Sequence, residues 1–547
     1  MRIQSAKSLV LSLFGRAMHL PYDLVTQRSS ISYGNFRNQL DIGWRKFLKI
    51  LVTIFGFVIF VALQFLTAKT VIDDKWLYVA MAYFSIVCII IVVFKPHIAV
   101  MTWLVLSPWL ALFLHARVGQ GALKFNFDNL MLFFLTVTLS IRALKNRQSL
   151  KALSLAELLM LCYFLYANVI PLFSNRLTIG AVGSTLSLLQ TPFIIYFVTK
   201  ESFRNPKQIK WAMGVFIVMG LLWALTGWYE HYTGKMWLSS IVGFDIPLQY
   251  KDVGTGRARG PADHLYTYGA INILCAFITF HMAGYCQKAS TKVLYYIASF
   301  IMVIGLLFIY SRTPYLAFGA SLFVVMLLTN RDRKRYITAS IIIVLAIVIY
   351  VPVMINDSSV RNRMENAETY YQRVGMNLTA INIIRHNFLF GVGKVNVQDA
   401  INKYVTQMWA GRDTDARGRR VYVAPHNDFL LVFATYGLIG FIFHFGSILC
   451  FLGRLIRYRS ITPKDSVIGR DFIAIVVAFI VGCFVMMMFG EFQTGTFLYS
   501  IIAVILALGV RSAELSSNSQ SKLCSQSHLE VSNNTAHPVP SGYRGGN

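Results

Sequence analysis

The sequence predicts an all-α protein built as a polytopic transmembrane helical bundle. Of its 547 residues, 56% are hydrophobic and only 14% are charged, whereas soluble domains have about 45–50% apolar and about 25% charged residues. The apolar residues also form uncharged blocks, such as 50–68, 341–354 and 473–489. A helix needs roughly 20 apolar residues to cross the hydrocarbon, where it satisfies its own backbone hydrogen bonds. These blocks are therefore expected to be membrane-spanning helices.

The apolar blocks, taken in chain order, predict twelve to fourteen spans. They lie at about 48–68, 77–94, 97–115, 127–141, 153–173, 178–199, 209–229, 265–287, 293–310, 314–329, 336–355, 428–453, 471–489 and 492–510. The first span follows a mixed, basic segment at 1–47 and is long enough to cross the membrane. We therefore expect a retained signal anchor rather than a cleaved signal peptide.

The distribution of Lys and Arg predicts the orientation of these spans. With the N-terminal segment 1–47 inside, the cytoplasmic loops 142–151, 200–210, 331–335 and 454–470 hold four, four, four and five Lys/Arg. This is the positive-inside pattern of an inner membrane protein. The net charge of +27 is thus spread over short loops, and nucleic-acid binding, which needs a basic soluble domain, is not expected.

Two predicted outer segments, 230–264 and 356–427, are too long to be simple turns. The second segment is basic, with ten Lys/Arg against six Asp/Glu. A basic outer segment suits an anionic ligand, although it is also what a solvated loop facing lipid head groups would show. Residues 511–547 are rich in Ser, Asn and Gln and are expected to be a disordered cytoplasmic tail.

The cysteines predict neither a metal site nor a disulfide framework. Six of the seven lie inside apolar blocks, and no Cys-x-x-Cys or Cys/His spacing occurs. Buried cysteine behaves as a small hydrophobic residue. We expect no metal and no cofactor.

Three arginines stand at the predicted outer edge of spans. Arg312, in Tyr-Ser-Arg-Thr-Pro, follows a long apolar block, and Arg257 and Arg259 lie in a Gly-rich turn before the span at 265–287. Ionisable residues at the membrane edge are functional candidates, and a guanidinium binds phosphate bidentately. The alternatives are an Arg that snorkels to the interface and an ordinary basic turn.

Further candidates stand before and after the last spans. His426 and Asn427 precede the span at 428–453, Arg373 lies in the long outer segment, and Glu491 follows the block that ends at Phe489. A histidine with an ordinary pKa near 6.5 is mostly neutral at neutral pH and can act as a base. Taken singly, His426 and Asn427 are also explained as a helix cap, Arg373 as a solvated face and Glu491 as an edge carboxylate.

Several of these strings resemble one family. Residues 425–440, with Pro-His-Asn-Asp-Phe-Leu and Tyr-Gly-Leu-Ile-Gly, are similar to the His-Asn and Gly-Leu-Ile-Gly signature of the bacterial O-antigen ligase and O-antigen polymerase superfamily. Ser311-Arg312-Thr313 resembles its Ser-Arg element, and Arg373 with Phe-Leu-Phe-Gly-Val-Gly at 388–393 resembles its loop motif. Arg-x-Arg-Gly at 257–260 is similar to its upstream Arg-Gly element. The resemblance covers about residues 210–510.

One departure from the family concerns the upstream element. The family usually has an Asn shortly after a Pro, whereas this chain has Pro261-Ala-Asp263-His264. This chain therefore lacks that asparagine of the family.

The resemblance implies a membrane glycosyltransferase with a GT-C-like fold. The donor would be an undecaprenyl-pyrophosphate-linked glycan in the periplasmic leaflet of the bacterial inner membrane, and the acceptor a glycan or a lipid-linked glycan. Arg257, Arg259, Arg312 and Arg373, with Asn427 and Glu491, would bind the pyrophosphate or substrate without a metal. His426 would be the base of an inverting transfer. A flippase and a chain-length regulator are candidate partners.

Within this class, the long basic outer segment favours polymerisation of repeat units into O-antigen or exopolysaccharide. The alternative is an O-antigen ligase that transfers the glycan to lipid A core or to another acceptor. A transporter or flippase of lipid-linked sugars is a rival from another class. Transporters place ionisable residues near the bilayer midplane between repeated halves, and the sequence shows no such repeat.

Overall fold

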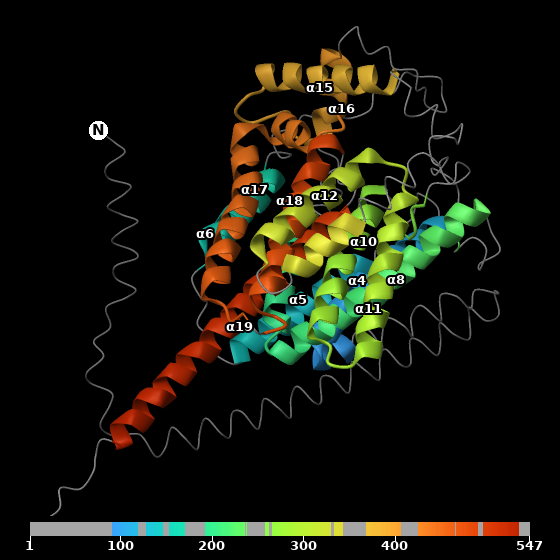
Figure 1. Ribbon diagram of the computed structural model, residues 1–547. Helices are drawn as coiled ribbons and strands as arrows, with labels where there is room; N and C mark the ends of the chain where they lie inside the picture. The colour runs from blue at the N-terminus through green and yellow to red at the C-terminus, as the bar shows by residue number, and fades with distance from the viewer. Residues whose placement is uncertain are drawn as a thin grey trace, which may run out of the picture. The chain divides into compact units, whose positions relative to one another are not determined.

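The described part of the chain is a bundle of helices (Figure 1). In the computed structural model, the described residues are 90–118, 127–145, 153–169, 192–235, 237, 258–261, 265–329, 333–342, 368–405, 425–464, 466–490 and 496–534. The chain divides into two compact units, Met1–Val87 and Cys88–Asn547, and the described residues all belong to the second. They contain helices and turns and no strand. The predicted all-α fold is confirmed.

Most predicted spans between residues 97 and 510 correspond to helices. In chain order these are α4 (Pro96–Val118), α5 (Phe127–Lys145), α6 (Leu155–Val169), α8 (Pro206–Thr233), α10 (Leu265–Tyr285), α11 (Ala289–Leu307), α12 (Arg312–Leu328), α15 (Glu368–His386), η3 (Lys394–Asn396), α16 (Val397–Tyr404), α17 (Asp428–Ile461), α18 (Arg470–Phe489) and α19 (Thr496–Asn534). Among the described residues, six helices are long and apolar enough to cross a membrane, and three shorter apolar helices accompany them. The protein is a multi-pass membrane protein. The predicted span at 48–68 and most of the one at 77–94 lie outside the described residues, so the total remains a prediction.

Helix α8 shows how local sequence sets the helix ends. Asn205 caps its start by accepting a hydrogen bond from the Lys207 amide at 2.9 Å, and Gln208 accepts one from the Asn205 amide at 3.1 Å. Together they form a capping box, with Pro206 in the first turn, where its missing N–H costs nothing. Gly234 ends the helix with a φ of 64°, a left-handed conformation that glycine adopts without strain.

Helices α10 and α18 form the centre of the bundle. Helix α10 packs against α8 and α11, while α18 packs against α12, α17 and α10. Both are buried on nearly all sides, and a helix that is apolar all round belongs in a core. From α10 to α12, and from α17 to α18, the chain reverses direction at each short connection between helices (Figure 1). As a result, α8, α11 and α18 end where α10, α12 and α17 begin.

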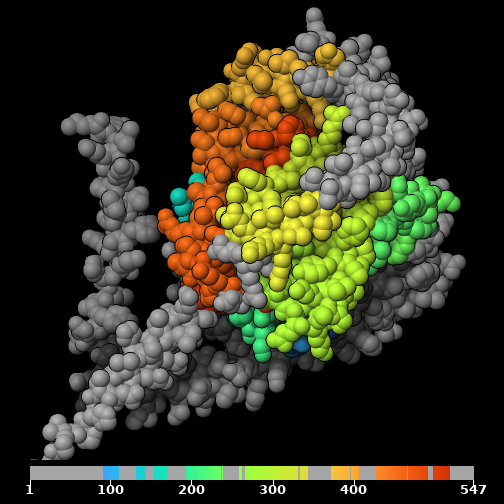
Figure 2. Space-filling model, viewed as in Figure 1, coloured from blue at the N-terminus to red at the C-terminus, as the bar shows by residue number. Residues whose placement is uncertain are grey.

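The outer segment 356–427 contains helices rather than a simple loop. Helix α15 ends at His386, and η3 and α16 follow it. An apolar cluster holds α15 and α16 against α17. It consists of Met376, Ile383, Ala400, Ile401 and Ala434. Figure 2 shows α15, in gold, lying over the end of the bundle.

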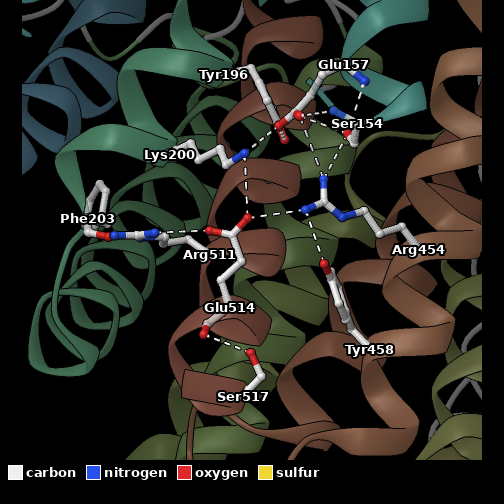
Figure 3. Close-up of polar contacts among 10 residues, drawn as sticks. All are labelled: Ser154, Glu157, Tyr196, Lys200, Phe203, Arg454, Tyr458, Arg511, Glu514 and Ser517. Atoms are coloured by element: carbon white, nitrogen blue, oxygen red, sulfur yellow. Dashed lines mark hydrogen bonds and ion pairs between the residues drawn. The ribbon is translucent and has the colours of Figure 1, made fainter. Parts of the chain in front are cut away.

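A network of charged residues ties four helices together at the opposite end. Figure 3 shows Lys200, Arg454 and Arg511 converging on Glu157 and Glu514. Lys200 Nζ lies 2.5 Å from Glu157 Oε1, and Arg454 and Arg511 lie 3.2 and 3.0 Å from the two Glu514 oxygens. These residues come from α6, the helix at 192–202, α17 and α19. Three of the predicted cytoplasmic basic residues are therefore used to join helices.

Helix α19 differs from the sequence prediction. The sequence predicts a span that ends near residue 510 and a disordered tail from 511, whereas the helix continues to Asn534. Arg511 and Glu514 anchor its continuation through the charged network. A helix that is already nucleated by a buried span propagates through polar residues at little cost, and no Gly or Pro interrupts the sequence before Pro538.

Candidate functional site

A buried carboxylate at the end of α8 holds the turn that carries Arg259. Glu230 is 2% exposed, and its Oε2 accepts hydrogen bonds from the amides of Arg259 and Gly260 at 2.9 and 2.7 Å. Gly260 has a φ of 58°, which favours glycine at this position. On the other side of the turn, the Ala258 amide donates to the Phe308 carbonyl at 3.0 Å. Arg259 is thus fixed between the ends of α8 and α11.

The junction of α11 and α12 places Arg312 beside that turn. Phe308 stacks on His231 of α8, with ring centroids 4.2 Å apart. Tyr310 has a φ of 48°, a left-handed conformation that costs a bulky residue about 1–3 kcal/mol. Arg312 is the first residue of α12 and is exposed. Because Phe308 contacts both α8 and the Arg259 turn, Arg259 and Arg312 arise from neighbouring backbone segments.

A second group of polar residues lies where α15 meets the start of α17. Burial and the positive charge of Arg373 lower the pKa of His426 below its usual value. Arg373 and Asn377 are four residues apart on α15 and so share one face. Three buried polar atoms here have no hydrogen-bond partner among the described residues: Arg373 Nε, Asn377 Oδ1 and His426 Nδ1. Asn427 caps α17, accepting from the Leu430 amide at 3.1 Å.

Two glycine motifs fix α15 onto α17. Helix α17 is broken at Gly437, with a φ of 65° and a ψ of −171°, and the loop at 388–393 lies against the break. Four backbone hydrogen bonds join them: Val392 N to Ala434 O (3.0 Å), Gly393 N to Thr435 O (2.8 Å), Leu438 N to Phe388 O (2.8 Å) and Ile439 N to Leu389 O (3.4 Å). The loop thereby satisfies carbonyls and amides that the helix would otherwise have paired internally. We call this contact the glycine interlock.

The glycine interlock leaves no room for side chains at its centre. A Cβ on Gly391 would overlap the backbone at Thr435 and Gly437, and one on Gly437 would overlap the Leu389 carbonyl. From α6, the Tyr166 hydroxyl donates to the Tyr436 carbonyl at 3.0 Å, which satisfies another group freed by the break. The position of α15, and with it of Arg373, is therefore set by backbone contacts with α17.

Both groups lie at the same end of the bundle. Helix α18 packs against α10, α12 and α17, and the Tyr266 hydroxyl at the start of α10 contacts the Phe489 carbonyl at the end of α18 at 3.5 Å. The starts of α12 and α17, which carry Arg312 and His426, therefore adjoin the same end of α18. Among the described candidates, Arg259, Arg312, Arg373 and His426 therefore share one end of the bundle; that this end faces outward stays a prediction. Arg257 and Glu491 lie outside the described residues.

Comparison with known families bears on these elements directly. A family model described as O-antigen ligase matches residues 297–445. The matched stretch runs from within α11 to the middle of α17, and it contains Arg312, Arg373, His426 and both motifs of the glycine interlock.

The matched stretch supports membership of the O-antigen ligase and polymerase superfamily. No curated protein matches it. For a member of this superfamily, the substrates are lipid-linked glycans and the setting is the bilayer. Arg259 and Glu230 lie upstream of the matched stretch.

Sequence reasoning assigned no role to Glu230 and Asn377. It placed Glu230 at the start of an outer loop, although an acidic residue at the end of an apolar block is itself a functional signal. Asn377 appears in the Arg-x-x-x-Asn spacing, but only the helix of α15 shows that both residues share a face. Within the described ranges, no cluster of three or more His, Cys, Asp or Glu is placed to hold a metal ion.

Proposed function

We propose that this protein polymerises undecaprenyl-pyrophosphate-linked oligosaccharide repeat units into O-antigen or exopolysaccharide. The reaction would take place at the periplasmic face of the inner membrane. The main support for this proposal is that His426 lies near Arg373, because this places a candidate base beside a cation that can bind phosphate. Arg312 and Arg259 at the same end of the bundle add two guanidinium groups.

In the proposed reaction His426 acts as the general base. Its lowered pKa keeps the imidazole neutral at neutral pH, so it can accept a proton. The acceptor sugar hydroxyl attacks the anomeric carbon of the donor, and its proton passes to the imidazole. The bond between that carbon and the pyrophosphate oxygen breaks with its electron pair on the leaving group. Attack from the opposite side inverts the anomeric configuration.

The arginines would stabilise the departing pyrophosphate. Negative charge develops on its oxygens as the bond breaks, and preorganised cations in a poorly hydrated site lower the barrier to that step. Arg373 and Arg312 are the first candidates, and Arg259 is held rigidly by Glu230. We propose that these groups serve without a metal ion, so extension should continue in EDTA.

The test is extension of lipid-linked repeat units by protein reconstituted in liposomes. We expect His426→Ala and Arg312→Ala to lose extension while keeping the thermal unfolding midpoint of the wild type. His386→Ala is the matched control, because His386 is exposed at the end of α15. Wild-type extension by His426→Ala would reject the base assignment.

Transfer by an O-antigen ligase is the second candidate, and the description of the matched family favours it. The two reactions share the donor and differ only in the acceptor. Supplying lipid A core instead of a second lipid-linked repeat unit separates them. A polymerase produces a ladder of chain lengths from the repeat unit alone, whereas a ligase produces none until lipid A core is added.

A further inference from the structure

An apolar pocket lies on the side of α17 that faces α6 and α19, away from the apolar cluster with α15. Aromatic and aliphatic side chains from α6, the helix at 192–202, α17 and α19 line it: Tyr163, Phe164, Phe193, Phe451, Ile502 and Leu506. Such a lining matches hydrocarbon, and burying hydrocarbon in it would be favourable.

The pocket has a cation at one end. Lys394 lines it, and the residue before it, Gly393, donates to the Thr435 carbonyl at 2.8 Å. Lys394 therefore lies near the level of the helix break. Burial lowers the pKa of its ammonium group to about 8, so it still carries most of its charge at neutral pH. Among the described residues that line the pocket, it is the only Lys, Arg, Asp or Glu.

The other end of the pocket adjoins the charged network. Tyr196 lines the pocket and its hydroxyl donates to Glu157 Oε1 at 2.9 Å. Along α17 the lining continues from Tyr436 to Phe451, a distance of about 22 Å at the helical rise. One leaflet of hydrocarbon is about 15 Å thick, half of the bilayer core. The pocket is long enough for an acyl chain.

A polar atom inside the pocket gives a second indication of a ligand. His444 lines the pocket with its ring 4.6 Å from that of Tyr163. Its Nε2 is buried and has no hydrogen-bond partner in the described part of the chain. An unsatisfied polar atom in apolar surroundings is costly. An ester group or a water brought in with a lipid would remove that cost.

We propose that this pocket binds an anionic phospholipid of the bilayer, with an acyl chain between α6, α17 and α19 and its phosphodiester on Lys394. A phosphodiester carries one negative charge, which one ammonium group neutralises. A diphosphate carries more charge and is better served by the guanidinium groups at the start of α12 and on α15. This site is separate from the proposed transfer site.

The experiment measures lipid binding by native mass spectrometry. Protein stripped of lipid by detergent exchange is incubated with equimolar phosphatidylglycerol and phosphatidylcholine in mixed micelles. We expect the wild type to retain phosphatidylglycerol preferentially. Lys394→Gln should weaken that binding roughly tenfold to a hundredfold, since a charge-assisted hydrogen bond is lost, whereas Lys394→Arg should keep it.

Two further variants separate the pocket from general surface binding. Lys403→Gln removes an exposed lysine of the neighbouring α16 and should bind like the wild type. Ala503→Phe fills the pocket with a ring and should lose both lipids; if it does not fold, the Lys394 variants still decide. Equal retention of the two lipids by the wild type, or unchanged binding by Lys394→Gln, would overturn the proposal. So would displacement of phosphatidylglycerol by a polyprenyl diphosphate, because the pocket would then belong to the donor.

Discussion

The glycine interlock makes a quantitative prediction about Gly437→Ala. The backbone at Gly437 combines a positive φ with an extended ψ, a region almost restricted to glycine, where another residue costs about 1–3 kcal/mol. The new methyl group would also overlap the Leu389 carbonyl and push the loop away. Losing two to four of the interlock's hydrogen bonds adds about 1 kcal/mol each. We expect a loss of stability of about 3–7 kcal/mol in total.

The assay can use the protein's own cysteines. Cys275 and Cys483 are free and buried, so a thiol-reactive fluorophore reports their exposure as the protein unfolds on heating. Gly437→Ala should lower the midpoint by several degrees, and Gly391→Ala should do the same. Because both substitutions break one contact, their effects should not add in the double variant.

Gly453→Ala provides the matched control. Gly453 lies in the same helix, and a Cβ there would meet nothing within 4 Å. Alanine is a better helix former than glycine by up to about 1 kcal/mol, so this variant should melt at or slightly above the wild-type midpoint. If Gly437→Ala and Gly453→Ala had the same unfolding midpoint, the reasoning about the interlock would be refuted.

Two further predictions concern the carboxylates of Glu230 and Glu514. Glu230→Gln retains one acceptor oxygen but presents an amide N–H₂ group to the Arg259 turn, so the rate of chain extension should fall roughly tenfold with little change in the unfolding midpoint. The control is Glu201→Gln, which changes an exposed carboxylate before α8 and should have no effect. Equal rates of extension for the two variants would remove Glu230 from the site. Glu514→Gln removes the carboxylate partner of Arg511 and one of the two of Arg454 and should destabilise the protein by about 2–4 kcal/mol, since the group is only partly exposed. The unfolding midpoint measures this loss, and an unchanged midpoint would show that the network is not structural.

The sequence predicted the helices well because their signal is local. Blocks such as 473–489 reach membrane-spanning length without a charge, and helix is the conformation that satisfies the backbone there. The family motifs were also visible in sequence. The structural role of these motifs was not visible in the sequence. Gly437 and Gly391 are brought together across more than 40 residues, and no local pattern shows that a loop fills a break in a helix.

The candidate site was predicted in part. The resemblance grouped Arg373 with His426, and in the structure Arg373 lies close enough to His426 to lower its pKa. The Arg259 turn contacts Phe308, which lies shortly before Arg312 in the chain. Glu230 was missed because the sequence placed it in a loop, whereas α8 continues to Thr233. The continuation of α19 was missed because a Ser- and Asn-rich composition predicts disorder, whereas a preceding buried span extends the helix.

The central claim is that a neutral His426 beside Arg373 is the base of the transfer reaction. Its most direct test is the pH dependence of chain extension in wild-type protein and in Arg373→Gln. A base must be unprotonated, so activity falls as the pH drops through the pKa of His426. Burial and Arg373 lower that pKa; the acid limb of the wild type should therefore lie below about pH 6.5.

Arg373→Gln removes the positive charge that, together with burial, lowers the pKa of His426. The acid limb of this variant should therefore move to higher pH. Arg385→Gln removes an exposed arginine of the same helix and should leave the limb in place. An acid limb at the same pH in all three proteins, or one above pH 6.5 in the wild type, would contradict the account.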